Sequence, residues 1–283
     1  MTAAGATAKP TLKIEVDEGR EPTRAELLDA MLDAYGHFTA MQVRDGRTRG
    51  LDLHLARLDA ANREVFGEEL DSERVRSLIR HALADESSDA SVRVIVRGAG
   101  AGSSGSGSGQ SGTGPGPRTR VFVTVRAPFT MPHDASQRLK SARYVRTAPH
   151  IKRPGDFGQS YHIAQAERAG YDDALLVADD GTITEAAIAN IAFFNGSNVI
   201  WPDAPVLPGI TMQVIAPRLA EFGMPSRTAR VTLADVGGFP GVCVTNSRGI
   251  AAVTGIDEVE FPIAAEFVKT MNAAYNAVPW DEI

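Results

Sequence analysis

The chain has 283 residues, 43% of them hydrophobic and 23% charged, and its net charge is -6 at neutral pH. These values fit one large or two modest soluble globular domains, and an acidic chain gives no electrostatic reason to expect nucleic-acid binding. With a single cysteine, Cys243, no secretory signal among residues 1–13 and no apolar run long enough to cross a bilayer, we expect a cytoplasmic protein with no membrane partner.

The first half of the chain predicts a small domain of helices and strands. Thr23 can cap a helix because Glu26 follows three residues later, and Asp45-Gly46 after a strand-like run is a typical hairpin turn. From apolar periodicity we predict helices over Thr23–Met31 (stripe Leu27, Leu28, Met31) and Ser72–Ala84 (stripe Val75, Leu78, Ile79, Ala82), and strands over Phe38–Val43, Ala90–Arg97 and Val121–Val125.

Residues 98–117 are almost entirely Gly, Ser and Pro, which predicts a flexible loop. Strand-like segments flank it, so we interpret it as an expanded hairpin loop within one domain. A phosphate-binding glycine loop is rejected, because no G-x-G-x-x-G opens a helix there and the loop has no lysine. We place the domain boundary in the proline-containing connector 127–137, between a small domain (1–126) and a larger one (138–283).

The second half alternates strands, turns and helices. Gly170 is expected to end a helix, and Asn195-Gly196 to turn a hairpin. The predicted elements are strands over Leu139–Arg146, Asp173–Ala178, Ile191–Phe194, Val199–Trp201 and Val242–Val244, and helices over Ser160–Ala169 and from Leu207–Thr211 onward, with Met212, Ile215 and Leu219 as the apolar stripe.

Three chemical groups follow one another within Ile151–Thr211. Lys152 supplies an amine that can form a Schiff base, and Glu185 a carboxylate that can keep a pyridine nitrogen protonated. The turn Leu207–Thr211 opens a helix, where backbone amides can bind phosphate. Pyridoxal 5'-phosphate requires all three groups from its protein.

The same segment resembles the core of the class IV aminotransferase family, the fold-type IV pyridoxal-phosphate enzymes. The resemblance rests on the lysine followed by G-Y-D-D-A-L-L-V, then D-G-T-I-T-E-A-A-I-A-N-I-A-F-F, V-I-W-P and L-P-G-I-T, with weaker matches from about Tyr35 to Ile256. It implies an α+β fold with a small N-terminal α/β domain and a larger barrel-like cofactor domain, and a homodimer. The family includes branched-chain and D-amino-acid aminotransferases, R-selective amine transaminases and aminodeoxychorismate lyase.

The resemblance assigns cofactor roles to residues at matching positions. Lys152 is the catalytic lysine, since no other lysine has the family spacing to the glutamate, and Glu185 faces the pyridine nitrogen. Arg57, in the family's H-x-x-R-L pattern after His54, grips the phosphate. The remaining implied contacts are Leu207, Gly209, Ile210 and Thr211 at the helix start, and Thr245, Asn246 and Ser247, whose register is open by one residue.

The resemblance implies substrate-pocket positions less firmly. Along the predicted strand Phe38–Val43 and the residue before it, alternation places His37, Thr39 and Met41 on one face and Phe38, Ala40 and Gln42 on the other. Which of the two faces points into the substrate pocket stays open. Arg93 and Arg248 could meet a substrate acid or face solvent. Phe157 stands where branched-chain members often carry a tyrosine, and Tyr161 could replace that hydroxyl if a helix starts near Asp156.

The sequence therefore predicts an aminotransferase that moves an amino group from a small-molecule amino donor to a 2-oxo acid or ketone. A lyase that eliminates pyruvate with the same cofactor is the alternative, because the site motifs do not separate the two. A cofactor-free relative with a binding role is a second alternative. We expect no metal site, because the six histidines show no ligand spacing such as H-E-x-x-H.

Overall fold

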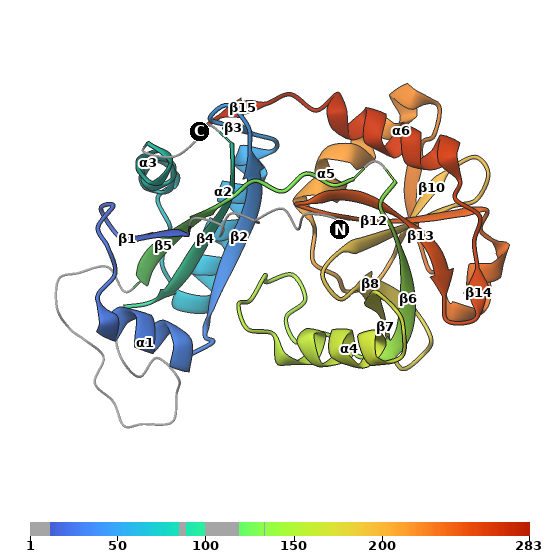
Figure 1. Cartoon of the computed structure of the whole chain (residues 1–283), viewed down its shortest axis with the longest axis horizontal. Helices are drawn as coiled ribbons and strands as arrows, with labels where there is room; N and C mark the ends of the chain where they lie inside the picture. The colour runs from blue at the N-terminus through green and yellow to red at the C-terminus, as the bar shows by residue number, and fades with distance from the viewer. Residues whose placement is uncertain (1–11, 85–88, 100–118, 133) are drawn as a thin grey trace, which may run out of the picture. The chain divides into compact units, whose positions relative to one another are not determined.

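The computed structural model describes residues 12–84, 89–99, 119–132 and 134–283. The chain forms two compact units (Figure 1). The first unit contains Met1–Thr48, Leu55–Phe129 and Glu282–Ile283, and the second contains Arg49–His54 and Thr130–Asp281. Helices and strands are mixed in both units, as the predicted α+β class requires. No helix among the described residues is long and apolar enough to cross a membrane.

The first unit is built on a four-stranded antiparallel sheet. Its strands run in the order β1 (Lys13–Val16), β5 (Thr119–Arg126), β4 (Ala90–Gly98) and β2 (Gly36–Val43). β4 and β5 pair from Ser91↔Arg126 to Gly98↔Thr119, as the hairpin prediction requires, although residues 100–118 of the loop lie outside the described part. A separate two-stranded sheet joins β3 (Arg47–Thr48) and β15 (Asp281–Glu282).

The first unit contains α1 (Arg24–Leu32), α3 (Ser72–Leu83) and α2 (Leu51–Phe66) from Leu55 onward. The predicted stripe of α3 is confirmed, because all four of its residues are buried. The capping box of Thr23 and Glu26 on α1 is also confirmed, but its predicted stripe is not a core face. Leu27 and Leu28 are each 43% exposed and Met31 is 72% exposed, so helical spacing here predicts the helix and not its burial.

The second unit is built on a nine-stranded mixed sheet. In order along the sheet the strands are β11 (Ser226–Ala229), β10 (Val199–Pro202), β9 (Asn190–Phe194), β12 (Gly241–Asn246), β13 (Gly249–Ile256), β6 (Ser136–Arg143), β7 (Asp173–Val177) and β8 (Ile183–Ala186), with β14 (Val259–Glu260) paired to β13. β8 ends the order at one side, yet it also contacts β9 and β10 near the other side. The sheet is therefore curled into a partly closed barrel.

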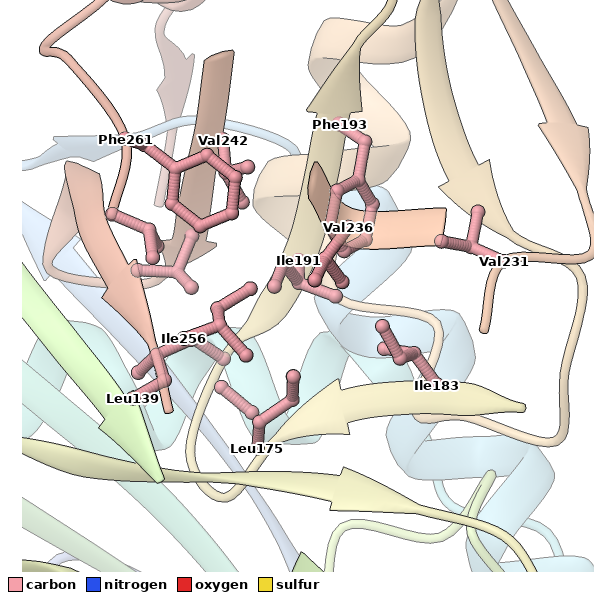
Figure 2. Packing of buried hydrophobic residues seen from close by; sticks show 14 of the residues in the cluster. Leu139, Leu175, Ile183, Ile191, Phe193, Val231, Val236, Val242, Ile256 and Phe261 are labelled. Carbon is pink, nitrogen blue, oxygen red and sulfur yellow. The ribbon is translucent and has the colours of Figure 1, made fainter. Parts of the chain in front are cut away.

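The curled sheet buries side chains on both of its faces, in strict alternation. Val242 and Val244 point into the interior cluster, whereas Cys243 between them packs into a second cluster outside. Figure 2 shows the interior cluster, in which Leu139 of β6, Leu175 of β7 and both Ile191 and Phe193 of β9 converge. Cys243 is a buried packing residue, and its complete burial raises the pKa of its thiol.

Helices cover the outside of this sheet. α4 (Phe157–Arg168) packs on β6 and β7, while α6 (Ala265–Asn276) packs on β13 and on α5 (Ile210–Ile215). Two 3-10 helices, η1 (Ala216–Phe222) and η2 (Leu233–Gly238), complete the unit.

Several predicted boundaries need correction. The predicted strand Leu139–Arg146 begins three residues too late, since β6 spans Ser136–Arg143 and leaves Arg146 in the following loop. The helix predicted from Leu207–Thr211 is α-helical only over Ile210–Ile215 and continues as a 3-10 helix, because Pro217 has no N–H for the α-helical ladder. α4 starts at Phe157 and not at Ser160, so a helix does begin near Asp156.

Candidate active site

Lys152 and Glu185 are neighbours in the second unit. Lys152 lies in the loop between β6 and α4, and Glu185 is a buried residue of β8. Burial raises the pKa of the Glu185 carboxyl above its ordinary value, and the charge of Lys152 is close enough to oppose that rise. The structure therefore brings together the amine and the carboxylate that the sequence singled out.

The Glu185 carboxylate also meets the predicted phosphate turn. Its Oε2 accepts a hydrogen bond from the Leu207 N–H at 3.3 Å. Asn190, on the neighbouring β9, donates from its Nδ2 to the Leu207 carbonyl at 2.8 Å. Buried side chains thus bind both the N–H and the carbonyl of Leu207, which fixes the backbone that leads to Gly209.

A second hydrogen bond joins the two predicted phosphate-binding segments. The Thr211 hydroxyl, at the start of α5, donates to the Asn246 carbonyl at the end of β12, at 2.8 Å. Asn246 in turn accepts the Arg248 N–H on its Oδ1 at 2.8 Å, and Ser247 lies in the turn between them. Thr245 and Asn246 belong to β12, so only Ser247 and Arg248 form the predicted turn.

One buried hydroxyl at this site has no partner. Thr245 is 1% exposed, and its Oγ1 has no hydrogen-bond partner among the described residues. An unpaired buried hydroxyl costs free energy, and such an atom beside a predicted phosphate turn is what a bound anion would satisfy.

Arg57 lies on α2 in the first unit. Its Nη2 donates to the Thr39 hydroxyl at 2.5 Å, while its Nε is buried without a partner among the described residues. Burial lowers the pKa of Arg57 to about 10, so the guanidinium stays charged at neutral pH. A charged arginine whose Nε has no partner among the described residues fits the phosphate-binding role that the H-x-x-R-L pattern implies.

The substrate-pocket candidates of the first unit share one face of its sheet. His37, Thr39 and Met41 are buried on the opposite face, which leaves Phe38 and Ala40 partly exposed. Ala40 is in register with Arg93, whose guanidinium lies 5.6 Å from the centre of the Phe38 ring. The two strands therefore bring Phe38, Ala40 and Arg93 together on one face, while the face with His37 packs into the core of this unit. That Phe38 and Ala40 face the substrate stays a prediction.

The aromatic candidates of the second unit lie on α4. Phe157 is 79% exposed and Tyr161 48% exposed, and their rings stack with centres 5.9 Å apart. The ring of Tyr161 also contacts His162 edge to face. That Tyr161 supplies the missing hydroxyl stays a prediction. Arg248 is exposed at its turn.

The family to which these motifs belong follows from comparison with known proteins. The sequence profile described as amino-transferase class IV matches residues 36–256. The chain belongs to this family. The match confirms the resemblance of the Lys152, Glu185 and Leu207–Thr211 motifs to class IV aminotransferases.

Among class IV relatives, one is named a probable branched-chain-amino-acid aminotransferase of Rickettsia felis. It is 33% identical over 97 residues, which are 34% of this chain and 33% of the relative. The matched stretch thus spans about a third of the length of the curated relatives.

Solved class IV structures share the fold. A branched-chain amino acid aminotransferase from Thermobaculum terrenum has a TM-score of 0.78 at 15% identity, over 94% of this chain and 92% of that one. A hypothetical aminotransferase from Mycobacterium tuberculosis in its PLP-bound form has a TM-score of 0.74 at 19% identity, over 93% and 98%. At these identities the likeness establishes the fold.

Sequence reasoning missed two buried residues of this candidate site. Arg146, which the sequence placed at a strand end, contacts Glu185, and Asn190 contacts the Leu207 turn. Arginine and asparagine are mostly exposed, so only the folded chain reveals their burial. Among the described residues no group of three or more His, Cys, Asp or Glu could hold a metal ion.

Proposed function

We propose that the protein is a pyridoxal 5'-phosphate-dependent aminotransferase, which moves an amino group between an amino acid or amine and a 2-oxo acid or ketone. The observation that carries this proposal is the buried contact of Glu185 with both Arg146 and Leu207, beside Lys152. Membership of the class IV family supports it independently.

The residues present fit this cofactor at its phosphate end. The Ile210 and Thr211 amides begin α5, and Gly209 before them adds no side chain that would block an anion. The buried Thr245 hydroxyl and the buried Arg57 Nε find no hydrogen-bond partner in the part of the chain that the structure describes. We propose Arg57, Ile210, Thr211 and Thr245 as ligands of the cofactor phosphate, and Leu207, Gly209, Asn246 and Ser247 as further cofactor contacts.

When bound, the cofactor supplies an electron sink next to the substrate's α-carbon. Lys152, as a neutral amine, would hold the cofactor through its aldehyde carbon with loss of water, and as a free amine it would carry the substrate's α-proton. The Glu185 carboxylate favours a protonated pyridine nitrogen, as a nearby opposite charge does. Both roles need a site that holds Lys152 and Glu185 in fixed positions.

The substrate side of the proposal uses side chains that are at least partly exposed within their own unit. Phe38, Ala40, Phe157 and Tyr161 offer apolar contact, and Arg93 offers a charge for a substrate acid, as does Arg248. The relative's name, a branched-chain-amino-acid aminotransferase, supports an amino acid as the donor.

We also propose a homodimer in the cytoplasm. Apolar side chains that a lone chain leaves in water support self-association: Leu27, Leu28, Met31 and Leu32 on α1, and Phe157 on α4. A single buried cysteine fits a reducing compartment. Light scattering after gel filtration measures the assembly directly.

The first test is the absorbance spectrum of the purified protein with added pyridoxal 5'-phosphate. We expect a band in the yellow region that borohydride abolishes, with the reduced cofactor recovered on a peptide containing Lys152. Lys152→Ala should lose this band, whereas Lys140→Ala, which removes a partly exposed lysine paired with Asp257, should keep it. A wild-type protein without the band contradicts the proposal and favours the cofactor-free alternative.

A half-reaction separates aminotransferase from lyase. An aminotransferase given only an amino donor converts its cofactor to the pyridoxamine form and stops. A lyase releases pyruvate from an aminodeoxychorismate-like substrate and leaves the cofactor in its aldehyde form. Release of pyruvate with the cofactor left in its aldehyde form would contradict the aminotransferase proposal and favour the lyase.

A further inference from the structure

Arg146 joins the two segments that carry Lys152 and Glu185. Its side chain is 3% exposed, and its Nη1 donates to the Glu185 Oε1 at 3.1 Å. The same Nη1 donates to the Pro149 carbonyl at 2.9 Å, and Nη2 donates to the Ile151 carbonyl at 3.0 Å. One buried guanidinium thus binds both β8 and the loop of Lys152, which it contacts at Ile151, one residue before the lysine.

We propose that Arg146 is a positioning residue that keeps the buried Glu185 carboxylate ionised and holds the Lys152 segment against it. The role of Glu185 toward a pyridine nitrogen rests on the proposed function. The charge state of Glu185 does not, because it is a property of this chain alone.

Arg146 is the strongest influence that favours the ionised carboxylate. Burial raises the pKa of Glu185; the charge and hydrogen bond of Arg146 oppose this first, followed by the Leu207 amide and the charge of Lys152. Lys152 must be a neutral amine to act as a nucleophile or base, so its charge cannot be relied on during turnover. An arginine keeps its charge at any working pH, which leaves Arg146 as the constant partner.

The nearest other acid, Asp156, also interacts with the charge of Arg146, which helps to lower the pKa of that carboxyl, but it accepts no hydrogen bond from Arg146. Asp156 Oδ2 lies 3.7 Å from the Arg146 Nε, too far for a hydrogen bond. That oxygen accepts from Arg153 Nη2 at 2.9 Å, and Tyr144 donates to the other oxygen of Asp156 at 3.2 Å. Arg153 is therefore the hydrogen-bonded cation of Asp156, and Glu185 is the acid that accepts a hydrogen bond from Arg146.

The chemical consequence concerns one proton. A buried carboxylate tends to take the proton of a neighbouring protonated nitrogen, which would leave both groups neutral. The guanidinium of Arg146, hydrogen-bonded to Glu185, disfavours this transfer because it stabilises the ionised carboxylate. Glu185 can then act as the counterion of a protonated ring nitrogen.

Infrared spectroscopy of the cofactor-free protein tests the charge directly. Arg146→Met should show a protonated carboxylic acid band at neutral pH that disappears in Arg146→Met with Glu185→Gln. Wild type and the control Arg153→Gln should show no carboxylic acid band that Glu185→Gln removes. If Arg146→Met fails to fold, the difference between wild type and Glu185→Gln still decides, since a protonated Glu185 in wild type at neutral pH overturns the proposal.

Cofactor affinity gives the second readout. Pyridoxal 5'-phosphate is compared with an analogue that has carbon in place of the ring nitrogen and cannot be protonated there. Arg146→Met should lose about tenfold or more of the wild-type preference for the natural cofactor, as a shift of one pKa unit corresponds to a tenfold change. In the Glu185→Gln background the same substitution should leave the preference unchanged.

The outcomes separate the two proposals. A wild-type protein that binds neither compound contradicts the proposed function, while the infrared result still decides the role of Arg146. Equal loss of affinity for both compounds in Arg146→Met, with Glu185 ionised throughout, would mean that Arg146 only supports the loop and would overturn the inference.

Discussion

Gly209 has a φ of −66°, which any residue adopts, so its backbone does not require glycine. The requirement comes from Asn190. A Cβ built on Gly209 would lie 1.9 Å from the Asn190 Oδ1, and Asn190 also donates to the Leu207 carbonyl. The absence of one methyl group therefore allows the turn to approach β9 and places the amides of Ile210 and Thr211.

Gly209→Ala should move Asn190 and weaken its hydrogen bond to Leu207. We expect a loss of about 1–3 kcal/mol in the free energy of unfolding, as for overpacking of a tight interior, together with weaker binding of pyridoxal 5'-phosphate. Denaturant unfolding and a cofactor titration measure the two effects. Gly237→Ala is the control, because a Cβ there meets nothing within 4 Å. Equal stability of the two variants would refute the steric argument.

Residues named by a motif could be found from the sequence, and residues that act through tertiary contact could not. Lys152 and Glu185 have a characteristic spacing, and the structure places them together. Arg146 has no local signature, because its three acceptors are brought to it by the loop and by β8. Pairing of charges across distant segments depends on the fold, which residue spacing does not encode.

At the scale of elements, the sequence predicted best those turns and helix caps whose conformation depends on neighbouring residues. The Asp45-Gly46 turn has φ values of 51° and 69°, as a two-residue hairpin requires, and Thr23 caps α1 as its sequence indicates. The exposed stripe of α1 shows the limit, since periodicity does not say what covers a helix. Proline at 217 could have signalled the change to 3-10 geometry.

The N-terminus of α2 has a cap that no local pattern could reveal. The Leu51 N–H donates to the Asp281 carboxylate at 2.9 Å, across 230 positions of sequence. Arg49, two residues before Leu51, lies between the Tyr275 and Trp280 rings, 4.5 Å and 4.1 Å from their centres. The segment around Trp280 and Asp281 therefore anchors the start of the helix that later carries Arg57.

Asp281→Ala should leave the Leu51 N–H without its partner and remove a negative charge from the positive end of α2. The expected cost is about 1 kcal/mol of unfolding free energy, as for loss of a helix cap, measured by thermal unfolding followed by circular dichroism. Glu282→Ala, the next position along, removes an exposed carboxylate and should change little. A similar loss in both variants would show that the cap is not the cause.

At the scale of the whole molecule, two buried groups give the units opposite responses to pH. Burial raises the pKa of Asp173 in the second unit to about 6 and lowers the pKa of His37 in the first unit to about 4. The ordinary values are about 3.9 and 6.5, so each shift corresponds to on the order of 3 kcal/mol. Asp173 contributes stability that is present below pH ~4 and lost as pH rises to 6. The contribution of His37 is present above pH ~6.5 and lost as pH falls to 4.

Both tryptophans, Trp201 and Trp280, belong to the second unit, so their fluorescence follows the unfolding of that unit. Relative to wild type, Asp173→Asn should gain stability in this signal as pH rises from 4 to 6, because the variant has no buried carboxyl to ionise. His37→Gln should leave the tryptophan signal unchanged and instead protect the amides of β2 from hydrogen exchange at pH 5, relative to wild type, because glutamine has no proton to take up. If either variant changed the pH dependence of both the tryptophan fluorescence and the hydrogen exchange of β2, the assignment of one titrating group to each unit would be contradicted.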